Sequence, residues 1–114
     1  MAISIDRLKG SIPPIITPFH PETLEIDEET FAGLVEHQIE NGSHGVLING
    51  TSAEPSTLTI DERNRLVTRA VQVANGRVPV VAATGSQSLA ETQALTDHAV
   101  RTGVDALLIV TPYY

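Results

Sequence analysis

Two short stretches of this sequence carry side chains that could bind and activate a small molecule. The first is GTSAE at residues 50–54, in which Thr51 and Ser52 supply hydroxyl groups and Glu54 supplies a carboxylate. Small residues let backbone N–H groups approach a ligand, and hydroxyl groups can donate hydrogen bonds or relay protons. This combination suits a small carboxylate or an oxyanion. A turn that satisfies its own backbone would use the same residue types, so both interpretations stay open.

The second stretch is the pair Tyr113-Tyr114, which holds the only two tyrosines of the sequence. A phenol at the mouth of a strand can act as an acid or a base when a neighbouring hydroxyl or charge tunes it. Tyrosine pairs are also ordinary packing or interface residues. Of the remaining polar groups in the first stretch, Glu54 is expected to hold the shape of the loop, because a general base would need burial to raise its pKa.

Several other kinds of chemistry are excluded or unsupported. The sequence has no cysteine, which excludes disulfides, thiolate catalysis and cysteine metal sites. Its four histidines show no metal-ligand spacing, and no G-x-S-x-G motif marks a serine nucleophile. A net charge of −7, from 14 acidic and 7 basic residues, disfavours nucleic acid and anionic membranes as partners. No apolar run approaches the roughly 20 residues that cross a bilayer, and the first ten residues lack a signal-like apolar core. We therefore expect a soluble cytoplasmic protein.

Elements that could position these groups recur along the chain. Four nearly continuous apolar runs, at residues 11–17, 45–49, 78–83 and 106–110, are typical of parallel strands buried on both faces. Three stretches between them have helical spacing: Phe31, Leu34, Val35, Gln38 and Ile39; Leu66, Val67, Ala70, Val71 and Ala74; and Leu95, Ala99 and Val100. A strand–helix unit thus repeats about every 30 residues.

Capping residues support the same boundaries. Predicted N-caps are Asp27, Thr59 with Glu62, and Ser88 with Glu91, the last two as capping boxes; predicted left-handed ends are Gly42, Gly76 and Gly103. Repeated βα units build either a doubly wound sheet or a (β/α)₈ TIM barrel. The G-x-G-x-x-G fingerprint is absent, whereas polar residues follow four successive strands, at Thr17 and at residues 51–54, 84–86 and 111–114. The pattern favours the barrel.

A barrel needs eight such units and typically about 250 residues. These 114 residues supply four expected strands and three helices. We therefore expect residues 1–114 to be the N-terminal part of a single TIM-barrel domain. An uncovered sheet of this size would expose two edges and an apolar face. The alternatives are therefore a half-barrel that completes itself by dimerising and a small open sheet that buries its edges in another way.

Three ordered motifs give the chain a family resemblance. GSIPPIITPF at residues 10–19, GTSAEPSTL at 50–58 and VTPYY at 110–114 resemble the dihydrodipicolinate synthase/N-acetylneuraminate lyase family in sequence, order and separation. The family's loop usually reads G-T-T-G-E-S or G-S-T-G-E. Here Ser52 replaces a usual threonine, Ala53 a usual glycine and Pro55 a usual serine; Ser52 can still donate a hydrogen bond, and Ala53 disfavours a left-handed backbone at its position.

The resemblance implies a (β/α)₈ barrel and an enzyme of the class I aldolase type, a carbon–carbon or carbon–oxygen lyase. Members form a Schiff base between a lysine and pyruvate or another 2-keto acid. The favoured activity is condensation of pyruvate with aspartate semialdehyde, as in lysine biosynthesis, and no cofactor is expected. The alternative within the family is an aldolase or dehydratase acting on a 2-keto-3-deoxy sugar acid or another 2-keto acid.

The resemblance also implies roles for particular residues. Thr51 and Ser52 match the loop that binds the keto acid's carboxylate, and Thr51 also matches a hydroxyl proton relay. Tyr114 matches the tyrosine that joins this relay from the neighbouring subunit, which implies a homodimer or homotetramer. Gly50, Glu54 and Tyr113 would support the site.

The Schiff-base lysine is missing from residues 1–114. The only lysine, Lys9, precedes the first expected strand and so belongs at the opposite end of a barrel. In the family the reactive lysine lies on a later strand, after the position that matches Tyr114. A non-catalytic module that binds a keto acid is therefore the alternative outside the enzyme class.

Overall fold

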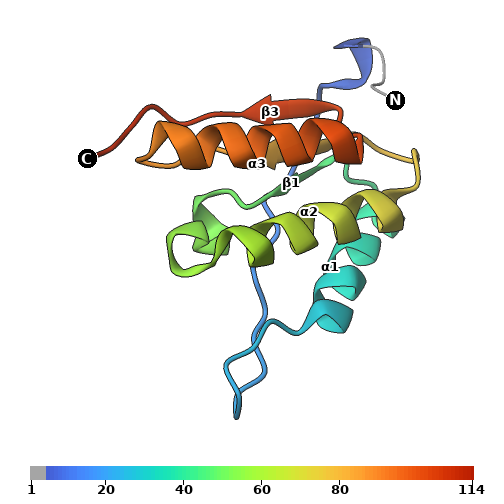
Figure 1. Cartoon of the computed structure of the whole chain (residues 1–114). Helices are drawn as coiled ribbons and strands as arrows, with labels where there is room; N and C mark the ends of the chain where they lie inside the picture. Colours follow the sequence, from blue (N-terminus) through green and yellow to red (C-terminus); the bar gives the residue numbers. More distant parts are fainter. Residues whose placement is uncertain (1–4) are drawn as a thin grey trace.

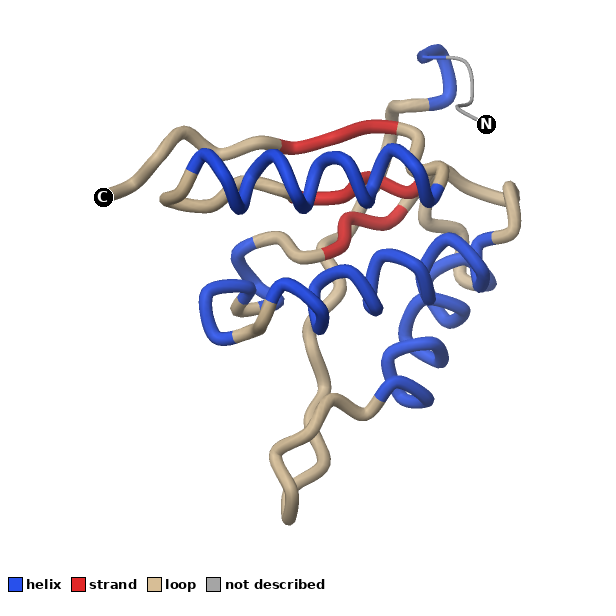
Figure 2. The backbone as a smooth tube through the Cα atoms, viewed as in Figure 1, coloured by secondary structure: helices blue, strands red, loops and turns tan. Residues whose placement is uncertain are grey.

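Three parallel strands form the sheet of this computed structural model, which describes residues 5–114. The strands are β1 (Val46–Ile48), β2 (Val80–Ala83) and β3 (Ala106–Leu108), and they lie side by side in chain order. Val46 is paired with Val80, and Ala82 with Leu107. Figure 1 shows these strands above helix α2, and Figure 2 shows the same arrangement with the strands in red.

The first expected strand, residues 11–17, is not assigned as a strand, and this part of the prediction is wrong. Only a single parallel bridge joins Pro14 to Leu47. The segment nevertheless lies beside β1, because the Ile15 N–H donates to the Leu47 carbonyl (2.9 Å) and the Leu47 N–H donates to the Pro13 carbonyl (3.0 Å). Two adjacent prolines explain the difference, since a proline has no N–H to give to a strand ladder.

Each pair of successive strand segments is joined by a helix near the position that the apolar spacing predicted. The helices are α1 (Glu28–Glu40), α2 (Ile60–Ala74) and α3 (Leu89–Thr102), and short 3₁₀ turns are η1 (Ile5–Arg7), η2 (Thr51–Ala53) and η3 (Pro55–Thr57). None of the helices within residues 5–114 is long and apolar enough to cross a bilayer.

The helix caps follow the sequence with one difference. Asp27 caps α1, and Thr59 and Glu62 form the complete capping box of α2. Ser88 caps α3 through the Glu91 N–H, but the Glu91 carboxylate accepts from the Ser86 hydroxyl (2.7 Å) instead of completing a box. At the helix ends, Gly103 is the left-handed cap of α3 as predicted; Gly42 and Gly76 have positive φ but follow an asparagine that takes the cap position.

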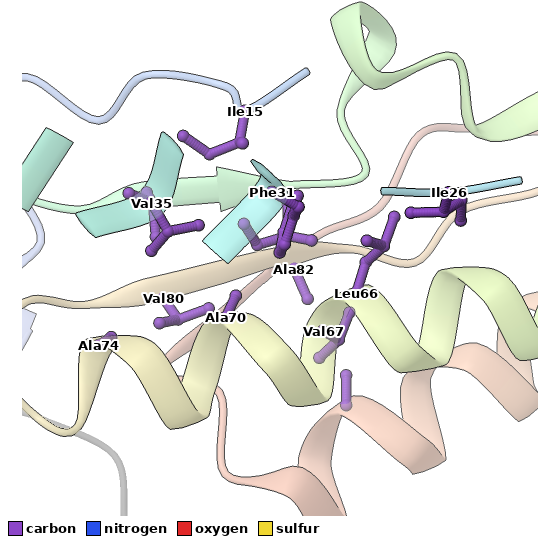
Figure 3. Close-up of a cluster of buried hydrophobic side chains, with 13 residues drawn as sticks. Ile15, Ile26, Phe31, Val35, Leu66, Val67, Ala70, Ala74, Val80 and Ala82 are labelled. Atoms are coloured by element: carbon purple, nitrogen blue, oxygen red, sulfur yellow. The ribbon is translucent and has the colours of Figure 1, made fainter. Parts of the chain in front are cut away.

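All three helices pack on one face of the sheet. Alternate strand residues, such as Val46 and Ile48, are buried in a single apolar cluster with residues of α1, α2 and α3. Figure 3 shows this layer, where Phe31 and Leu66 meet the sheet residue Ala82. The side chains between them, such as Leu47, point to the other face and are only half-buried.

Strand order and helix placement decide between the two architectures that the sequence left open. A doubly wound sheet reverses its strand order and carries helices on both faces. Here the segment at residues 11–17 and the three strands follow one another without reversal, and the helices share one face. The arrangement is that of consecutive units of a (β/α)₈ barrel, with the helices outside and the opposite strand face turned to the interior.

The cap of α1 yields a prediction about acid stability. Asp27 accepts hydrogen bonds from the hydroxyl and the N–H of Thr30 (2.7 and 3.0 Å). The bond from the hydroxyl has the larger effect, and together the two bonds lower the pKa of the Asp27 carboxyl below its ordinary value of 3.8. A lowered pKa means that the contribution to folding is present above the unfolded-state pKa and is lost as pH falls through the folded-state pKa. Asp27→Asn keeps a capping oxygen and cannot titrate. Wild type should exceed this variant in urea midpoint at pH 7, and the difference should shrink below about pH 4.

The matched control is Asp97→Asn, which removes the same charge from an exposed position inside α3. Its urea midpoint relative to wild type should lack this acid-dependent step. A wild-type advantage over Asp27→Asn that stays constant through the acid range would contradict the assignment.

Candidate active site

The carboxyl ends of the strands open onto a cavity of about 270 Å³. The loop after β1 contributes Gly50, Thr51 and Glu54 to its wall, the loop after β2 contributes Gly85, and the segment after β3 contributes Tyr113. Parallel strands place their carboxyl ends at one edge, which explains why three loops far apart in the sequence meet here. The cavity therefore lies where the sequence predicted a site.

Two 3₁₀ turns shape the loop after β1. The Ala53 N–H donates to the Gly50 carbonyl (2.9 Å), and the Glu54 N–H donates to the Thr51 carbonyl (3.1 Å). The buried Thr17 hydroxyl donates to the Ala53 carbonyl (2.7 Å), which ties the loop to the segment beside β1. The N–H groups of Thr51 and Ser52 open the first turn, so no carbonyl of that turn accepts them.

The residue that ends the first turn, Glu54, is left-handed at φ 57° and ψ 48°, whereas Ala53 belongs to the turn itself. The replacement of a usual glycine by Ala53 therefore puts no methyl group at a left-handed position. The conformation of Glu54 is uncommon for a residue with a side chain. Its backbone carbonyl accepts from the N–H and the hydroxyl of Thr57 (3.0 and 2.7 Å), and the exposed residue is part of the cavity wall.

The structure brings together some of the predicted site residues and separates others. Thr51, Gly50, Glu54 and Tyr113 line the cavity, and the Tyr113 hydroxyl donates to Gln87 Oε1 (2.7 Å). Ser52 lies in the same turn but is not part of the cavity wall. The side chain of Tyr114 is fully exposed and contributes nothing to the cavity within this chain.

Arg63 is a site residue that the sequence reasoning missed. It lies in the first turns of α2, is only 6% exposed, and lines the cavity. Its guanidinium donates to the carbonyls of Ala83 (2.9 Å) and Gly85 (3.3 Å) in the strand end and loop of β2. Burial lowers the pKa of the Arg63 guanidinium, and the nearby Tyr113 phenol and Glu91 carboxylate oppose that effect.

Asn49 is a second missed residue, directly after β1. Its side-chain N–H donates to the backbone carbonyl of Arg63 (3.0 Å), and its own φ is 63°. Signals for both residues are present in the sequence: Arg63 begins the spacing that continues through Leu66, Val67 and Ala70, and Asn49 ends an apolar run. A charged residue on a buried helical stripe indicates a polar partner beneath it.

Lys9 lies at the opposite end of the sheet, as its position in the sequence predicted. On one side of it, Arg7 donates to the carbonyl of Arg77, in the turn that precedes β2. On the other side, the Ser11 N–H donates to Nδ1 of His44, just before β1. Figure 1 shows η1 far from the C-terminal end of the chain. No group of three or more histidine, aspartate or glutamate side chains within residues 5–114 is arranged to hold a metal ion.

Comparison with known proteins identifies the family to which this chain belongs. The model of the dihydrodipicolinate synthetase family matches residues 7–114. The 4-hydroxy-tetrahydrodipicolinate synthase of Methylobacterium radiotolerans is 48% identical over 108 residues, which are 95% of this chain and 36% of that protein. The chain thus spans little more than a third of the length of this relative.

Solved structures agree with the sequence match. Dihydrodipicolinate synthase from Aquifex aeolicus has a TM-score of 0.88 at 40% identity, covering 93% of this chain and 36% of that one. A chloride-inhibited dihydrodipicolinate synthase from Acinetobacter baumannii, solved with pyruvate, has the same TM-score, identity and coverage. The repeated units described above are thus the N-terminal part of a TIM barrel, and the chain belongs to the dihydrodipicolinate synthetase family.

Proposed function

We propose that the protein containing this chain condenses pyruvate with aspartate semialdehyde through a lysine Schiff base, as a 4-hydroxy-tetrahydrodipicolinate synthase. The observation that carries the proposal is the cavity at the carboxyl ends of the strands, whose wall includes both Thr51 and Tyr113. The pyruvate complex of the Acinetobacter baumannii relative, at 40% identity, supports a keto acid as the ligand.

The loop after β1 would hold the pyruvate carboxylate. The N–H groups of Thr51 and Ser52 open a turn and have no acceptor within it, so they can donate to an anion together with the adjacent hydroxyl groups. The buried guanidinium of Arg63 on the cavity wall adds positive charge that favours an anionic ligand. The Glu54 side chain, on the same wall, would point away from the pyruvate carboxylate, because two negative charges repel each other.

Proton transfer would run through hydroxyl groups. In a Schiff-base reaction the lysine amine adds to the C2 carbonyl of pyruvate, and the carbonyl oxygen leaves as water after it gains protons. Thr51, on the cavity wall, would relay these protons together with Tyr114 of a neighbouring subunit. Tyr114 is free to reach a second subunit because its side chain is fully exposed on this chain.

The reactive lysine would have to come from outside these 114 residues, because Lys9 is their only lysine and lies at the other end of the sheet. This observation also favours a second candidate, a keto-acid-binding module without catalysis. Within the family, an aldolase or dehydratase of a 2-keto-3-deoxy sugar acid would use the same carboxylate loop, and the second substrate separates it from the synthase.

Borohydride trapping tests the function first. The protein is purified at its native length, incubated with pyruvate and sodium borohydride, and its intact mass is measured. Because borohydride reduces an imine to a stable amine, an active protein should gain the mass of one reduced pyruvate per chain, and peptide mapping should place it on a lysine other than Lys9. If calorimetry detects pyruvate binding but no adduct forms, the protein is the non-catalytic module. If pyruvate neither binds nor forms an adduct, the proposal is refuted.

Thr51→Val tests the relay. The substitution keeps a β-branched side chain and removes the hydroxyl, so turnover should fall by about a hundredfold while folding and subunit assembly stay unchanged. Thr57→Val is the matched control, because its hydroxyl bonds only the Glu54 carbonyl in the same loop. Steady-state kinetics check both variants. Equal turnover in Thr51→Val and wild type would remove Thr51 from the relay.

Tyr114→Phe tests the shared site. These subunits are mixed with subunits in which the lysine found by borohydride trapping is replaced. The mixture should regain activity, because a hybrid dimer contains one site in which both the lysine and the Tyr114 phenol are intact. Tyr113→Phe subunits should gain nothing from the same mixing, since Tyr113 lines the cavity of its own chain. The measurement is activity after reassociation. Failure of the Tyr114→Phe mixture to recover would place its phenol outside the neighbouring site.

A further inference from the structure

We propose that Arg63 is a positioning residue that fixes the spacing between the loops around the keto-acid cavity. Its effect on pyruvate rests on the function proposed above, whereas its effect on the loops does not. Hydrogen bonds join Arg63 on α2 to the ends of both neighbouring strands. We call the four residues that take part, Arg63, Asn49, Ala83 and Gly85, the Arg63 clamp.

The first arm of the clamp reaches the loop after β2. The Arg63 guanidinium donates to the Ala83 carbonyl (2.9 Å) and to the Gly85 carbonyl (3.3 Å), so it spans the point where the strand becomes a loop. A guanidinium carries five N–H donors in a fixed planar fork, which lets one side chain hold two carbonyls in a defined geometry. A lysine ammonium is a single point and cannot hold the same pair in that way.

The second arm reaches the loop after β1. The backbone carbonyl of Arg63 accepts from the Asn49 side chain (3.0 Å), and Asn49 immediately precedes Gly50 and Thr51. Asn49 is 2% exposed and left-handed, a conformation that its neighbourhood must hold in place. The direction in which the chain enters the carboxylate loop therefore depends on this bond.

The loop after β2 passes the constraint on to the third wall of the cavity. A Cβ added at Gly85 would lie 2.6 Å from Val110 Cγ1, so the two segments are already in close contact. Two residues further on, Gln87 accepts from the Tyr113 hydroxyl (2.7 Å). Moving the loop after β2 would thus move Tyr113 relative to Thr51.

Burying the charge of Arg63 costs more free energy than burying an apolar side chain that would fill the same space. Arg63 is a buried cation whose side chain bonds carbonyls and no carboxylate among the described residues. Within residues 5–114, the two buried side-chain atoms left without a partner, Arg63 Nε and Asn49 Oδ1, both belong to the Arg63 clamp. A leucine or methionine would continue the buried stripe of α2 without burying a charge. The cost of an arginine here indicates a geometric role.

The test compares Arg63→Lys and Arg63→Met with Arg65→Lys and Arg65→Met in the protein at its native length. Arg65 is exposed on the same helix and lies outside the cavity wall. The readouts are thermal midpoint, pyruvate kcat and KM, and hydrogen exchange of the hydrogen-bonded amides of Glu54 and Ser86. Arg63→Lys removes the planar guanidinium but keeps the backbone carbonyl that accepts from Asn49. Its thermal midpoint should stay near native, exchange at Ser86 and KM for pyruvate should rise about tenfold, and exchange at Glu54 should stay unchanged. The Arg65 variants should match wild type.

Asn49→Gly isolates the second arm. Glycine adopts the left-handed backbone freely, so the variant deletes the amide without imposing strain. Exchange should accelerate at Glu54 and stay unchanged at Ser86. Acceleration at both amides or at neither would overturn the two-arm arrangement.

Two results for Arg63→Lys would overturn the proposal. One is wild-type exchange together with wild-type KM, and the other is a lowered thermal midpoint with unchanged KM, because that combination describes a merely structural residue. If Arg63→Met fails to fold, the lysine variant still decides. If wild type forms no pyruvate adduct, the proposed function fails, but the exchange rates continue to test the clamp.

Discussion

The packing of three helices on one face of a short parallel sheet is the constraint on which the rest of this structure depends. Val46 and Ile48 alternate with Leu47, so one set of strand residues is buried against the helices and the other is turned away from them. Because a helix carries the chain back to the start of the sheet between successive strands, all strands point in one direction and their carboxyl ends gather at one edge. The cavity exists at that edge because three loops have to meet there.

Local signals predicted most of the fold because they act over a few residues. The capping box of Thr59 and Glu62 and the left-handed Gly103 are formed within one helical turn, and the sequence contains everything that they need. The expected strand at residues 11–17 was wrong because apolar composition says nothing about hydrogen-bond donors. The box expected at Ser88 is incomplete because Glu91 finds a partner in Ser86, outside the helix.

The candidate site was predictable in place but not in construction. Polar residues at successive strand ends located the cavity, and Thr51 and Tyr113 do line it. The bonds that hold its walls join residues 14 and 22 positions apart, from Asn49 to Arg63 and from Arg63 to Gly85. Such contacts depend on how α2 lies across two strands, which no local pattern reveals. The catalytic and binding roles of Thr51, Ser52 and Tyr114 all stay predictions, and Ser52 and Tyr114 lie outside the cavity wall of this chain.

The paired prolines beside β1 also bear on which backbone groups the outer edge of the sheet offers to another strand. In a parallel ladder the bonds to Leu47 come from Pro13 and Ile15, so the backbone groups of Pro14 itself face the outer edge of the sheet. That edge lacks a donor at Pro14, and a strand added there would leave one carbonyl unmatched. The proline at this position therefore makes the outer edge a poor template for a further strand.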